Sequence, residues 1–362
     1  ALVARARPPK NQAAMQTLAR RLPGMATSTC SALRSTATAA YLQSSAVDAG
    51  IQELAHKGYT IARLGAAASV RDMEVVAQKL MRIDGTGSGS YNGKGGVSRK
   101  TIDDTSFVDS AAGAPSELKI QFHNEMAYAT DFPKYVTFAM VHQADLDGTT
   151  ILADNVMVQS SMSEMLLNKF RMLGVQYIRH LHHESECDAP DYYMSWQGAF
   201  QTDSLQEAMK RGNNKDNFSM VEQCSDSRRL RHTLWCPVFH THPEHGEVFF
   251  NSVLNRHGSW MDGHAHWTPV PNSERPYHCL WGDGTELSQD ELTEIRRVYE
   301  DCTEYVRLNP GDVLVLDNLR VVHGRTPYSG KSRRLLGLLL SDMVPRAPCQ
   351  PPDAYMKVLN AA

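Results

Sequence analysis

Apolar residues from about position 47 onward first follow a helical spacing and then a strand-like one. Residues 47–57 and 68–83 place apolar side chains three and four positions apart, which predicts two amphipathic helices. Between them, residues 58–64 form a short run with aromatic and β-branched side chains, which predicts a strand. Ser69 stands at the start of the second helix, where its hydroxyl suits an N-cap. We therefore expect the folded part to begin near Asp48.

Strand patterns dominate the remainder of the chain. Short apolar runs bounded by turn residues predict strands at residues 135–142, 151–153, 174–179 and 312–316, and a further strand at 333–340 begins with two arginines. Helical spacing predicts a surface helix over residues 158–173 and another over 292–304, the latter preceded by a capping box of Ser288 and Glu291. The prolines that follow Asp342 predict an irregular tail. The whole pattern is that of a mainly β protein with flanking helices.

His123 and Glu125 are the first residues that point to chemistry. In an extended segment, side chains two positions apart face the same way, so one strand would offer an imidazole and a carboxylate to one ion. These are two of the three ligands in the two-histidine, one-carboxylate triad that holds non-haem Fe(II). The pair alone is a weak signal, because a second histidine must come from a distant strand. His323 is such a residue, since it follows the apolar run after Gly311.

Further short motifs accompany these residues and together resemble one family. They are Met126, Phe132-Pro133, Gly148-x-Thr150, Phe249-Phe250-Asn251, Gly311-Asp312-Val313-Leu314, Asp317-Asn318 ahead of His323, and Arg334 after it. From about Gly58 to about Asp342 the chain resembles the TauD/TfdA-like Fe(II)/2-oxoglutarate-dependent dioxygenases, in particular their clavaminate-synthase-like branch. The resemblance implies a double-stranded β-helix (jelly roll) core. We expect one catalytic domain over residues 48–345, with a long insertion at about 180–283, and a tail over 346–362.

The resemblance also implies an activity. Fe(II) would be held by the triad of His123, Glu125 and His323, with 2-oxoglutarate and O₂ as co-substrates. The enzyme would release succinate and CO₂ while hydroxylating or desaturating an unactivated C–H bond of a small molecule. Halogenating relatives replace the carboxylate ligand with a small residue, and because Glu125 is present we do not expect halogenation.

Two further residues match the family's 2-oxoglutarate site. Thr150 would bind a carboxylate of 2-oxoglutarate through its hydroxyl, although Asp147 stands where the family usually has a glycine. Arg334 would bind the distal carboxylate in a bidentate contact, for which a guanidinium has the right geometry. Its neighbour Arg333 would then face outward, because adjacent strand residues face opposite ways.

The sequence says less about the substrate. Residues next to the matched motifs are candidates for the substrate pocket: Asn124, Tyr128, Phe250 and Asn251. Arg325 is expected at the surface or rim, where it could also meet an anionic substrate. The substrate could be a pigment or its tetrapyrrole side chain, an amino acid or another small carboxylate.

The histidine-rich middle region leaves alternative functions open. Its histidines are His180, His182, His183, His240, His242, His245, His257, His264 and His266. They could hold zinc or a second metal, or they could be exposed or hydrogen-bonded histidines in an insertion over the barrel mouth. One alternative is therefore a zinc hydrolase that uses these histidines. Another is a non-catalytic cupin-like binding protein, which would predict a damaged triad, and none is seen.

Composition excludes several other classes. A chain of 362 residues and 40.3 kDa fits one β barrel with helical cover. No apolar run approaches the roughly 18 residues of a membrane span, and a net charge of −3 gives no basic footprint for nucleic acid. The seven cysteines form no CxxC pair, which argues against a disulfide framework or structural zinc.

The glycine-rich residues 85–96 are not a phosphate loop, because glycine follows Lys94, and we expect a loop near the active-site mouth. Nothing indicates the oligomeric state.

Residues 1–47 differ from the rest of the chain in composition. They contain no acidic side chain and carry several arginines among Ala, Ser and Thr. This composition is typical of an organellar transit peptide, with a plastid favoured over a mitochondrion. A disordered leader or part of a longer precursor would look similar, and without targeting the protein would be cytoplasmic. In each case we exclude this segment from the fold.

Overall fold

The computed structural model describes residues 41, 43–82, 101–103, 105–109, 115–186, 194–225, 228–330 and 335–361. Most of the expected leader, the glycine-rich segment at 85–96 and both Arg333 and Arg334 lie outside these ranges, so the expectations for them remain predictions. Within the described ranges, no helix combines the length and apolarity needed to cross a membrane.

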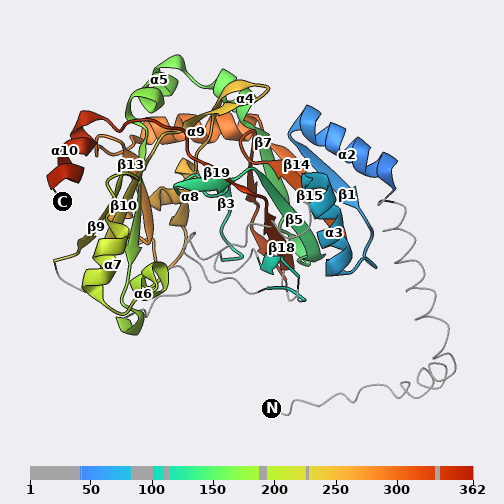
Figure 1. The fold of residues 1–362 in the computed structure, drawn as a ribbon, viewed down its shortest axis with the longest axis horizontal. Coiled ribbons are helices and arrows are strands. Elements are labelled where there is room, and N and C mark those ends of the chain that lie inside the picture. The colour runs from blue at the N-terminus through green and yellow to red at the C-terminus, as the bar shows by residue number, and fades with distance from the viewer. Residues whose placement is uncertain are drawn as a thin grey trace, which may run out of the picture.

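Two antiparallel sheets face each other and form the barrel (Figure 1). The five-stranded sheet has the order β1 (Tyr59–Arg63), β15 (Asp312–Asp317), β5 (Tyr135–His142), β18 (Leu335–Leu340) and β2 (Val108–Asp109). The four-stranded sheet has the order β14 (Glu304–Val306), β7 (Thr150–Asp154), β16 (Val321–Arg325) and β3 (Ile120–His123). Apolar side chains of both sheets fill the space between them, among them Phe138, Leu314, Leu152 and Val321. This arrangement is the double-stranded β-helix that the sequence predicted.

Two helices cover the outer face of the five-stranded sheet (Figure 1). They are α2 (Ser44–Lys57) and α3 (Val70–Met81), and their apolar sides pack on Val313 and Val315 of β15. Ser69 caps α3 in a capping box with Asp72, as its position predicted. The fold begins a few residues before the expected Asp48, because α2 starts at Ser44 and the half-buried Tyr41 packs on the same cluster.

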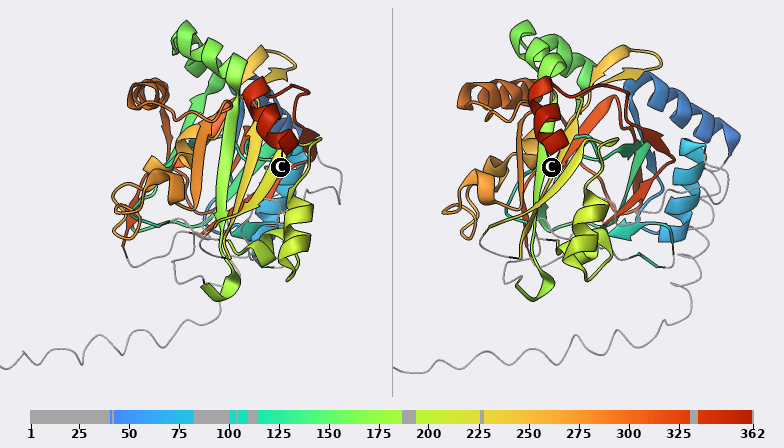
Figure 2. Two further views of the ribbon diagram at one scale, coloured as in Figure 1. Left: turned by 90° about the vertical axis from the view of Figure 1, so that its left-hand side faces the viewer. Right: turned by 60° about the vertical axis from the view of Figure 1, so that its left-hand side comes forward.

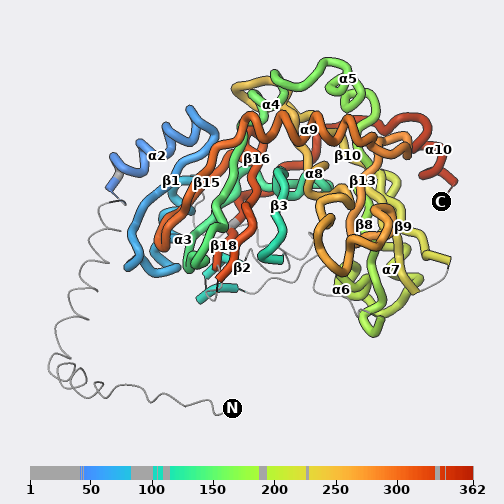
Figure 3. The backbone as a smooth tube through the Cα atoms, turned by 180° about the vertical axis from the view of Figure 1, so that it is seen from behind, coloured from blue at the N-terminus to red at the C-terminus, as the bar shows by residue number. Residues whose placement is uncertain are grey.

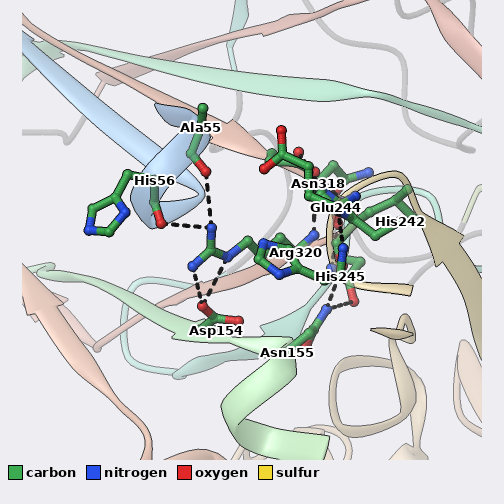
Figure 4. Close-up of polar contacts among 12 residues, drawn as sticks. Ala55, His56, Asp154, Asn155, His242, Glu244, His245, Asn318 and Arg320 are labelled. Atoms are coloured by element: carbon green, nitrogen blue, oxygen red, sulfur yellow. Dashed lines mark hydrogen bonds and ion pairs between the residues drawn. The ribbon is translucent and has the colours of Figure 1, made fainter. Parts of the chain in front are cut away.

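Arg320 ties α2 to the four-stranded sheet (Figure 4). Its guanidinium forms an ion pair of 2.9 Å with Asp154 at the end of β7. The same guanidinium donates to the carbonyls of Ala55 and His56, at 3.2 and 2.9 Å, in the last turn of α2. A cation is favourable there, because the final carbonyls of a helix have no partner within it. A cavity of about 410 Å³ lies beside this contact and is lined by Arg320, Asp317 and residues of both helices, but by none of the triad.

The middle of the chain builds a third sheet, which we call the side sheet. Its order is β13 (Tyr277–Trp281), β8 (Val175–Leu181), β10 (Leu230–Cys236) and β9 (Ser219–Gln223). Figures 1 and 3 show it at the opposite end of the molecule from α2 and α3. It packs through a large apolar cluster on the outer face of the four-stranded sheet, where Phe122 and Val322 lie. The insertion expected at about residues 180–283 therefore contributes β9, β10 and β13 to a sheet that also contains β8, which begins at Val175.

The remaining elements connect these sheets. Short strands pair as β6 (Leu146–Asp147) with β17 (Tyr328–Ser329) and β11 (Phe239–His242) with β12 (Gly246–Phe249). Four of the other helices are α6 (Trp196–Phe200), α7 (Leu205–Gly212), α8 (Val253–Arg256) and α9 (Gln289–Asp301), and 3₁₀ turns lie at Glu184–Glu186, Gly258–Met261 and Asn272–Glu274. Ser288 and Glu291 form the predicted capping box of α9. The helix ends at Asp301, so Glu304 begins β14 instead of closing the helix as expected.

The single surface helix expected over residues 158–173 is wrong. The structure has two helices, α4 (Asn155–Ser161) and α5 (Glu164–Leu173). Met162 adopts an extended conformation, and the Ser163 hydroxyl accepts the N–H of Leu166 as the N-cap of α5. The capping serine therefore starts a new helix within one continuous apolar pattern.

The expected irregular tail is also wrong. Residues Met343–Pro345 form β19, which pairs with β4 (Asp131–Pro133), and Asp353–Ala361 form α10. Figure 2 shows α10 lying along the side sheet, where Tyr355 and Leu359 pack on Trp235. The two residues are four apart and share one helix face, and Pro352 precedes the first turn, where proline does not disturb a helix. The prolines in this part of the sequence predicted an irregular tail, although the segment also contains a short amphipathic helix.

Candidate metal centre

The pairing of β3 with β16 brings the two predicted histidine ligands together. His123 and His323 are direct cross-strand partners, and their ring centroids are 4.3 Å apart. Both side chains lie on the inner face of the four-stranded sheet, because their neighbours Phe122 and Val322 pack on its outer side. Phe138 of the opposite sheet packs edge-on against His323, with 4.9 Å between the rings.

Gly324 allows this close approach of the two strands. The pairing of β16 with β3 changes register between His323 and Arg325. A Cβ on Gly324 would stand 2.5 Å from the carbonyl oxygen of Ile120 and 3.1 Å from the Ile151 side chain. Any other residue would therefore move β3 away from β16, and His123 with it.

Glu125 reaches the same point from beyond the end of β3. The strand ends at His123, and the chain turns at Met126, whose φ is +61°. The expectation that His123 and Glu125 both lie on one extended strand is thus incomplete, because Glu125 lies beyond the strand. Their side chains still converge. One carboxylate oxygen, Oε2, lies 3.9 Å from Nε2 of His123 and 3.7 Å from Nε2 of His323.

Asn318 fixes the backbone at Glu125. Its side-chain oxygen accepts the N–H of Glu125 at 2.8 Å, and its amide nitrogen donates to the Glu125 carbonyl at 3.0 Å. The same nitrogen also donates to the carbonyl of Pro133 at 2.9 Å. Asn318 is fully buried, so these bonds are not exchanged with water.

Asn124 and Asn251 belong to the same buried support and not to a substrate pocket, which corrects the expectation for both. Asn124 donates to the Asn318 carbonyl and accepts from the Asn251 N–H and from the side chain of Asn155. Asn251 donates to the Tyr299 hydroxyl and accepts the N–H of Val253. We call Asn124, Asn155, Asn251 and Asn318 the asparagine network; each is at most 1% exposed. Asn155 carried no signal in the sequence.

The hydrogen bonds of His123 direct a lone pair toward the centre. Its Nδ1 lies 2.8 Å from the carbonyl oxygen of Gln121, which can only accept, so Nδ1 carries the proton and Nε2 is free to bind a metal. Burial, together with the neighbouring His323, lowers the pKa of His123 to about 3, so the ring is neutral at ordinary pH. A neutral imidazole is the form that binds a metal.

The three side chains fit a divalent ion. Their ligating atoms all lie within 4.8 Å of one another; Glu125 and His323 are buried, and the His123 side chain is 11% exposed. The two nitrogen–oxygen separations are shorter than twice a bond of about 2.1 Å, so one ion can contact both atoms of each pair. Two imidazoles and one carboxylate form the donor set of non-haem Fe(II) sites, which leave positions open for other ligands.

A second group among the described residues has the same composition, namely His257, His278 and Glu286. Its hydrogen bonds are different. His278 accepts the N–H of Gly258 at Nδ1, and its Nε2 lies 3.0 Å from the Glu286 carboxylate, to which it donates. Both ring nitrogens are therefore used by the protein, and Glu286 is exposed. The group is satisfied as a hydrogen-bonded cluster.

Other histidines of the middle region are engaged in a similar way. His180 bonds the Arg275 carbonyl through Nδ1, at 2.7 Å. His242 donates to Asp317 and accepts backbone N–H groups of Glu244 and His245 (Figure 4). These contacts fit the expectation of structural histidines better than a zinc site.

Thr150 and Arg325 lie on the same inner face as the triad. They are direct partners across β7 and β16, two residues along from the pair of Leu152 and His323. Thr150 is buried, and its expected role at a carboxylate of 2-oxoglutarate remains a prediction. Arg325 is only 3% exposed, so its expected place at the surface or rim is wrong. Its guanidinium donates to the carbonyls of Pro115 and Leu118. Both carbonyls belong to the segment that precedes β3.

Tyr128 and Phe250, the other two expected pocket residues, pack on different apolar clusters, Tyr128 on the one outside the four-stranded sheet and Phe250 on the one between the sheets. Phe250 is buried among apolar side chains between the sheets and packs on Phe132, with 4.4 Å between the rings. Tyr128 is half-buried, and the guanidinium of Arg256 lies 3.6 Å from the centre of its ring. No motif in the sequence pointed to Arg256.

A jelly-roll barrel with two imidazoles and a carboxylate converging inside it defines a class, the non-haem iron dioxygenases. A sequence model of the family described as "Taurine catabolism dioxygenase TauD, TfdA family" matches residues 37–339, most of the chain. The chain belongs to the TauD/TfdA family, and it is an enzyme of the 2-oxoglutarate-dependent dioxygenase class, with Fe(II) as metal and 2-oxoglutarate as co-substrate.

Individual relatives are more distant. The chain is 29% identical over 242 residues to the dapdiamide synthesis protein DdaC of Enterobacter agglomerans, covering 66% of this chain and 70% of that protein. It is 26% identical over 237 residues to a clavaminate synthase-like protein of Arabidopsis thaliana, covering 64% and 68%. A crystal structure of asparagine oxygenase with Fe(II), 2S,3S-3-hydroxyasparagine and succinate aligns at 12% identity with a TM-score of 0.46, over 86% of this chain and 83% of that one.

Proposed function

We propose that this enzyme hydroxylates or desaturates an unactivated C–H bond of a small molecule at an iron centre held by His123, Glu125 and His323. The observation that carries the proposal is the convergence of the two imidazoles and the carboxylate on one buried point inside the barrel. Iron and 2-oxoglutarate, when bound, supply the oxidising power for such a bond. Succinate and CO₂ are the expected co-products.

The residues around the triad have distinct proposed roles. His123 and His323 bind the metal through Nε2, and Glu125 binds it through its carboxylate. The Thr150 hydroxyl and the Arg334 guanidinium bind the carboxylates of 2-oxoglutarate. In the described part of β18, Leu336 and Leu338 lie in the core between the sheets. An Arg334 that faces inward requires this same alternation of side chains. Phe138 and Leu152 keep water from the inner face.

Names of relatives support a small substrate. One is called enduracididine β-hydroxylase, from Streptomyces hygroscopicus, and is 39% identical over 54 residues, which cover 15% of this chain and 16% of that protein. The presence of Glu125 as a third protein ligand favours hydroxylation or desaturation over halogenation. An amino acid or a related small carboxylate is therefore the substrate class that we would test first.

The experiment that tests the proposal is a metabolite screen for substrate-dependent succinate release, with Fe(II), 2-oxoglutarate and O₂ present. A product heavier by one oxygen indicates hydroxylation, and one lighter by two hydrogens indicates desaturation. Glu125→Ala is expected to abolish release, because two protein ligands hold a divalent ion much more weakly than three. Glu125→Asp is expected to retain part of it, since a shorter carboxylate still reaches the ion after a small shift. Equal activity of Glu125→Ala and the wild type would contradict the proposal.

A further inference from the structure

A cavity of about 410 Å³ lies at the edge of the five-stranded sheet where β15 and β18 end and β5 begins. The C-terminal parts of α2 and α3 line it, together with the turn between β11 and β12. We call it the outer cavity, because none of the triad residues lines it. It is therefore a different space from the metal centre, and the proposed function does not use it.

Four aliphatic side chains form an apolar wall of the outer cavity: Ile51, Leu54, Leu80 and Met81. They belong to the cluster that packs α2 and α3 on the five-stranded sheet. Leu54, Leu80 and Met81 are buried, so this wall is part of a packed core. A fixed apolar wall inside a cavity favours an apolar ligand group, because that group leaves water when it binds.

Four exposed charged residues also line the outer cavity, two of each sign: Arg82, Lys134, Glu244 and Asp342. Within the described part of the chain, none of these four side chains forms an ion pair or a side-chain hydrogen bond. Unpaired charges of both signs around one cavity are available to a ligand that carries the opposite charges.

Other charged residues of the outer cavity already have partners. Arg320 forms its ion pair of 2.9 Å with Asp154, and the Asp317 carboxylate accepts from His242 at 3.1 Å. His242 also accepts the N–H of Glu244 at 3.1 Å, which holds the backbone of Glu244 at the cavity (Figure 4). This side of the cavity is therefore fixed before any ligand binds.

Lys134 and Asp342 also stand on a fixed backbone. The N–H of Lys134 donates to the Asp342 carbonyl at 3.1 Å, and the Lys134 carbonyl accepts the N–H of Asn318 at 3.0 Å. The Lys134 ammonium lies 5.1 Å from the centre of the Tyr135 ring. A ligand would have to order side chains here but no backbone, which lowers the entropic cost of binding.

The size and the charges of the outer cavity define a class of ligand. Small-molecule sites typically have volumes of about 300–1,000 Å³, and this cavity falls in that range. The two unpaired cations and two unpaired anions have no net charge, so a ligand with a single charge would leave one sign unmatched. A zwitterion matches both signs, and the apolar wall accepts an aliphatic group.

We propose that the outer cavity is a second small-molecule site, which binds a free α-amino acid with an aliphatic side chain. Lys134 and Arg82 contact its carboxylate, and Glu244 and Asp342 contact its ammonium group. The aliphatic side chain lies on the apolar wall formed by α2 and α3. Binding at this site requires neither the metal nor 2-oxoglutarate.

The test uses calorimetry of the full chain, loaded with Mn(II) and 2-oxoglutarate, and four probes. L-Leucine carries both charges, L-leucinamide lacks the carboxylate, and 4-methylpentanoate lacks the ammonium group. We expect each of these two analogues to bind about fivefold more weakly than leucine. Glycine lacks the side chain and should bind more weakly than leucine on the order of tenfold.

Two double variants assign the charges. Lys134→Gln with Arg82→Gln should remove the preference for leucine over leucinamide, and Glu244→Gln with Asp342→Asn should remove the preference over 4-methylpentanoate. All four residues are exposed, so neither variant should disturb the core. The matched control is Lys210→Gln, an exposed lysine of α7 outside the cavity, which should leave both preferences unchanged.

His323→Ala separates the outer cavity from the metal centre. This variant loses a metal ligand, and we expect it to bind leucine with the affinity of the wild type. Loss of leucine binding in His323→Ala would place the amino acid at the metal centre and overturn the inference. It is also overturned if the wild type binds no leucine, or if both double variants keep the preferences of the wild type.

Discussion

Asn318 determines the geometry of the proposed iron site without providing a ligand. It exchanges two hydrogen bonds with the backbone of Glu125 and also bonds the Pro133 carbonyl, all away from water. A carboxylate ligand must be held within a fraction of an ångström of its place, and the backbone that carries it must be held as well. The position of the Glu125 carboxylate therefore depends on the neutral side-chain amide of Asn318, which lies between β15 and β16.

Asn318→Ala is expected to weaken both metal binding and the fold. Removing the amide leaves the N–H and carbonyl of Glu125 buried without these partners, which costs about 3 kcal/mol of unfolding free energy. Divalent-metal affinity should fall about tenfold, because Glu125 is no longer held in place. Denaturant unfolding and Mn(II) calorimetry measure the two effects. The exposed Asn309→Ala is the control, and equal metal affinity in the two variants would contradict the role of Asn318.

At the scale of elements, the centre depends on how β3 meets β16. The two strands bring His123 and His323 into direct register and then change register at Gly324, where the backbone of Ile120 comes close. Helix α8 and the asparagine network hold β3 from its other side. The separation of the two histidines is therefore set by a strand contact that only glycine permits.

Gly324→Ala is expected to separate the histidines and weaken metal binding. The new methyl group would stand 2.5 Å from the Ile120 carbonyl oxygen, so β3 must move. Overpacking of this kind costs about 1–3 kcal/mol of stability. Gly198→Ala in α6 is the matched control, because its Cβ would meet the nearest atom at 3.3 Å and lies in a helix, where alanine is favoured. Unchanged Mn(II) affinity in Gly324→Ala would mean that the strand contact does not set the geometry.

Features set by the local sequence could be predicted, whereas features set by contacts between distant parts of the chain could not. The strand patterns and Ser69 and Ser288 as caps could be predicted, because local periodicity and spacing determine them. His323 as the partner of His123 was expected from the family resemblance, because no local pattern links two residues so far apart in the sequence. The sequence could not predict that Asn124 faces the asparagine network or that Arg325 is buried, since both depend on contacts more than a hundred residues away. Arg256 and the helix α10 were missed for the same reason: tertiary packing on Tyr128 and on Trp235 gives them their place.

At the scale of the whole molecule, several buried histidines make stability sensitive to acid. Burial lowers the pKa of His180 and of His240 to about 4, in the second case with help from the charge of Arg346. Burial also lowers the pKa of His257 to about 3. An unfolded chain would take up these protons near pH 6.5. Each histidine therefore contributes stability above pH 6.5 that is lost as the pH falls toward its folded pKa.

We expect the free energy of unfolding to fall as the pH drops from 6.5 to about 4. Each such histidine contributes a loss of about 1.4 kcal/mol per pH unit in that window. Urea unfolding at pH 7 and pH 5 measures the effect. His240→Gln should show a smaller loss than the wild type, whereas the exposed His56→Gln should show the same loss. An equal loss in the wild type and His240→Gln would contradict this assignment.

The central claim is that one Fe(II) binds to His123, Glu125 and His323 and not to the similar group of His257, His278 and Glu286. Anaerobic calorimetric titration of the full chain with Fe(II) tests it most directly. We predict one high-affinity Fe(II) per chain in the wild type, loss of that binding in His323→Ala, and its retention in His278→Ala. Tight Fe(II) binding that survives in His323→Ala and disappears in His278→Ala would contradict the account.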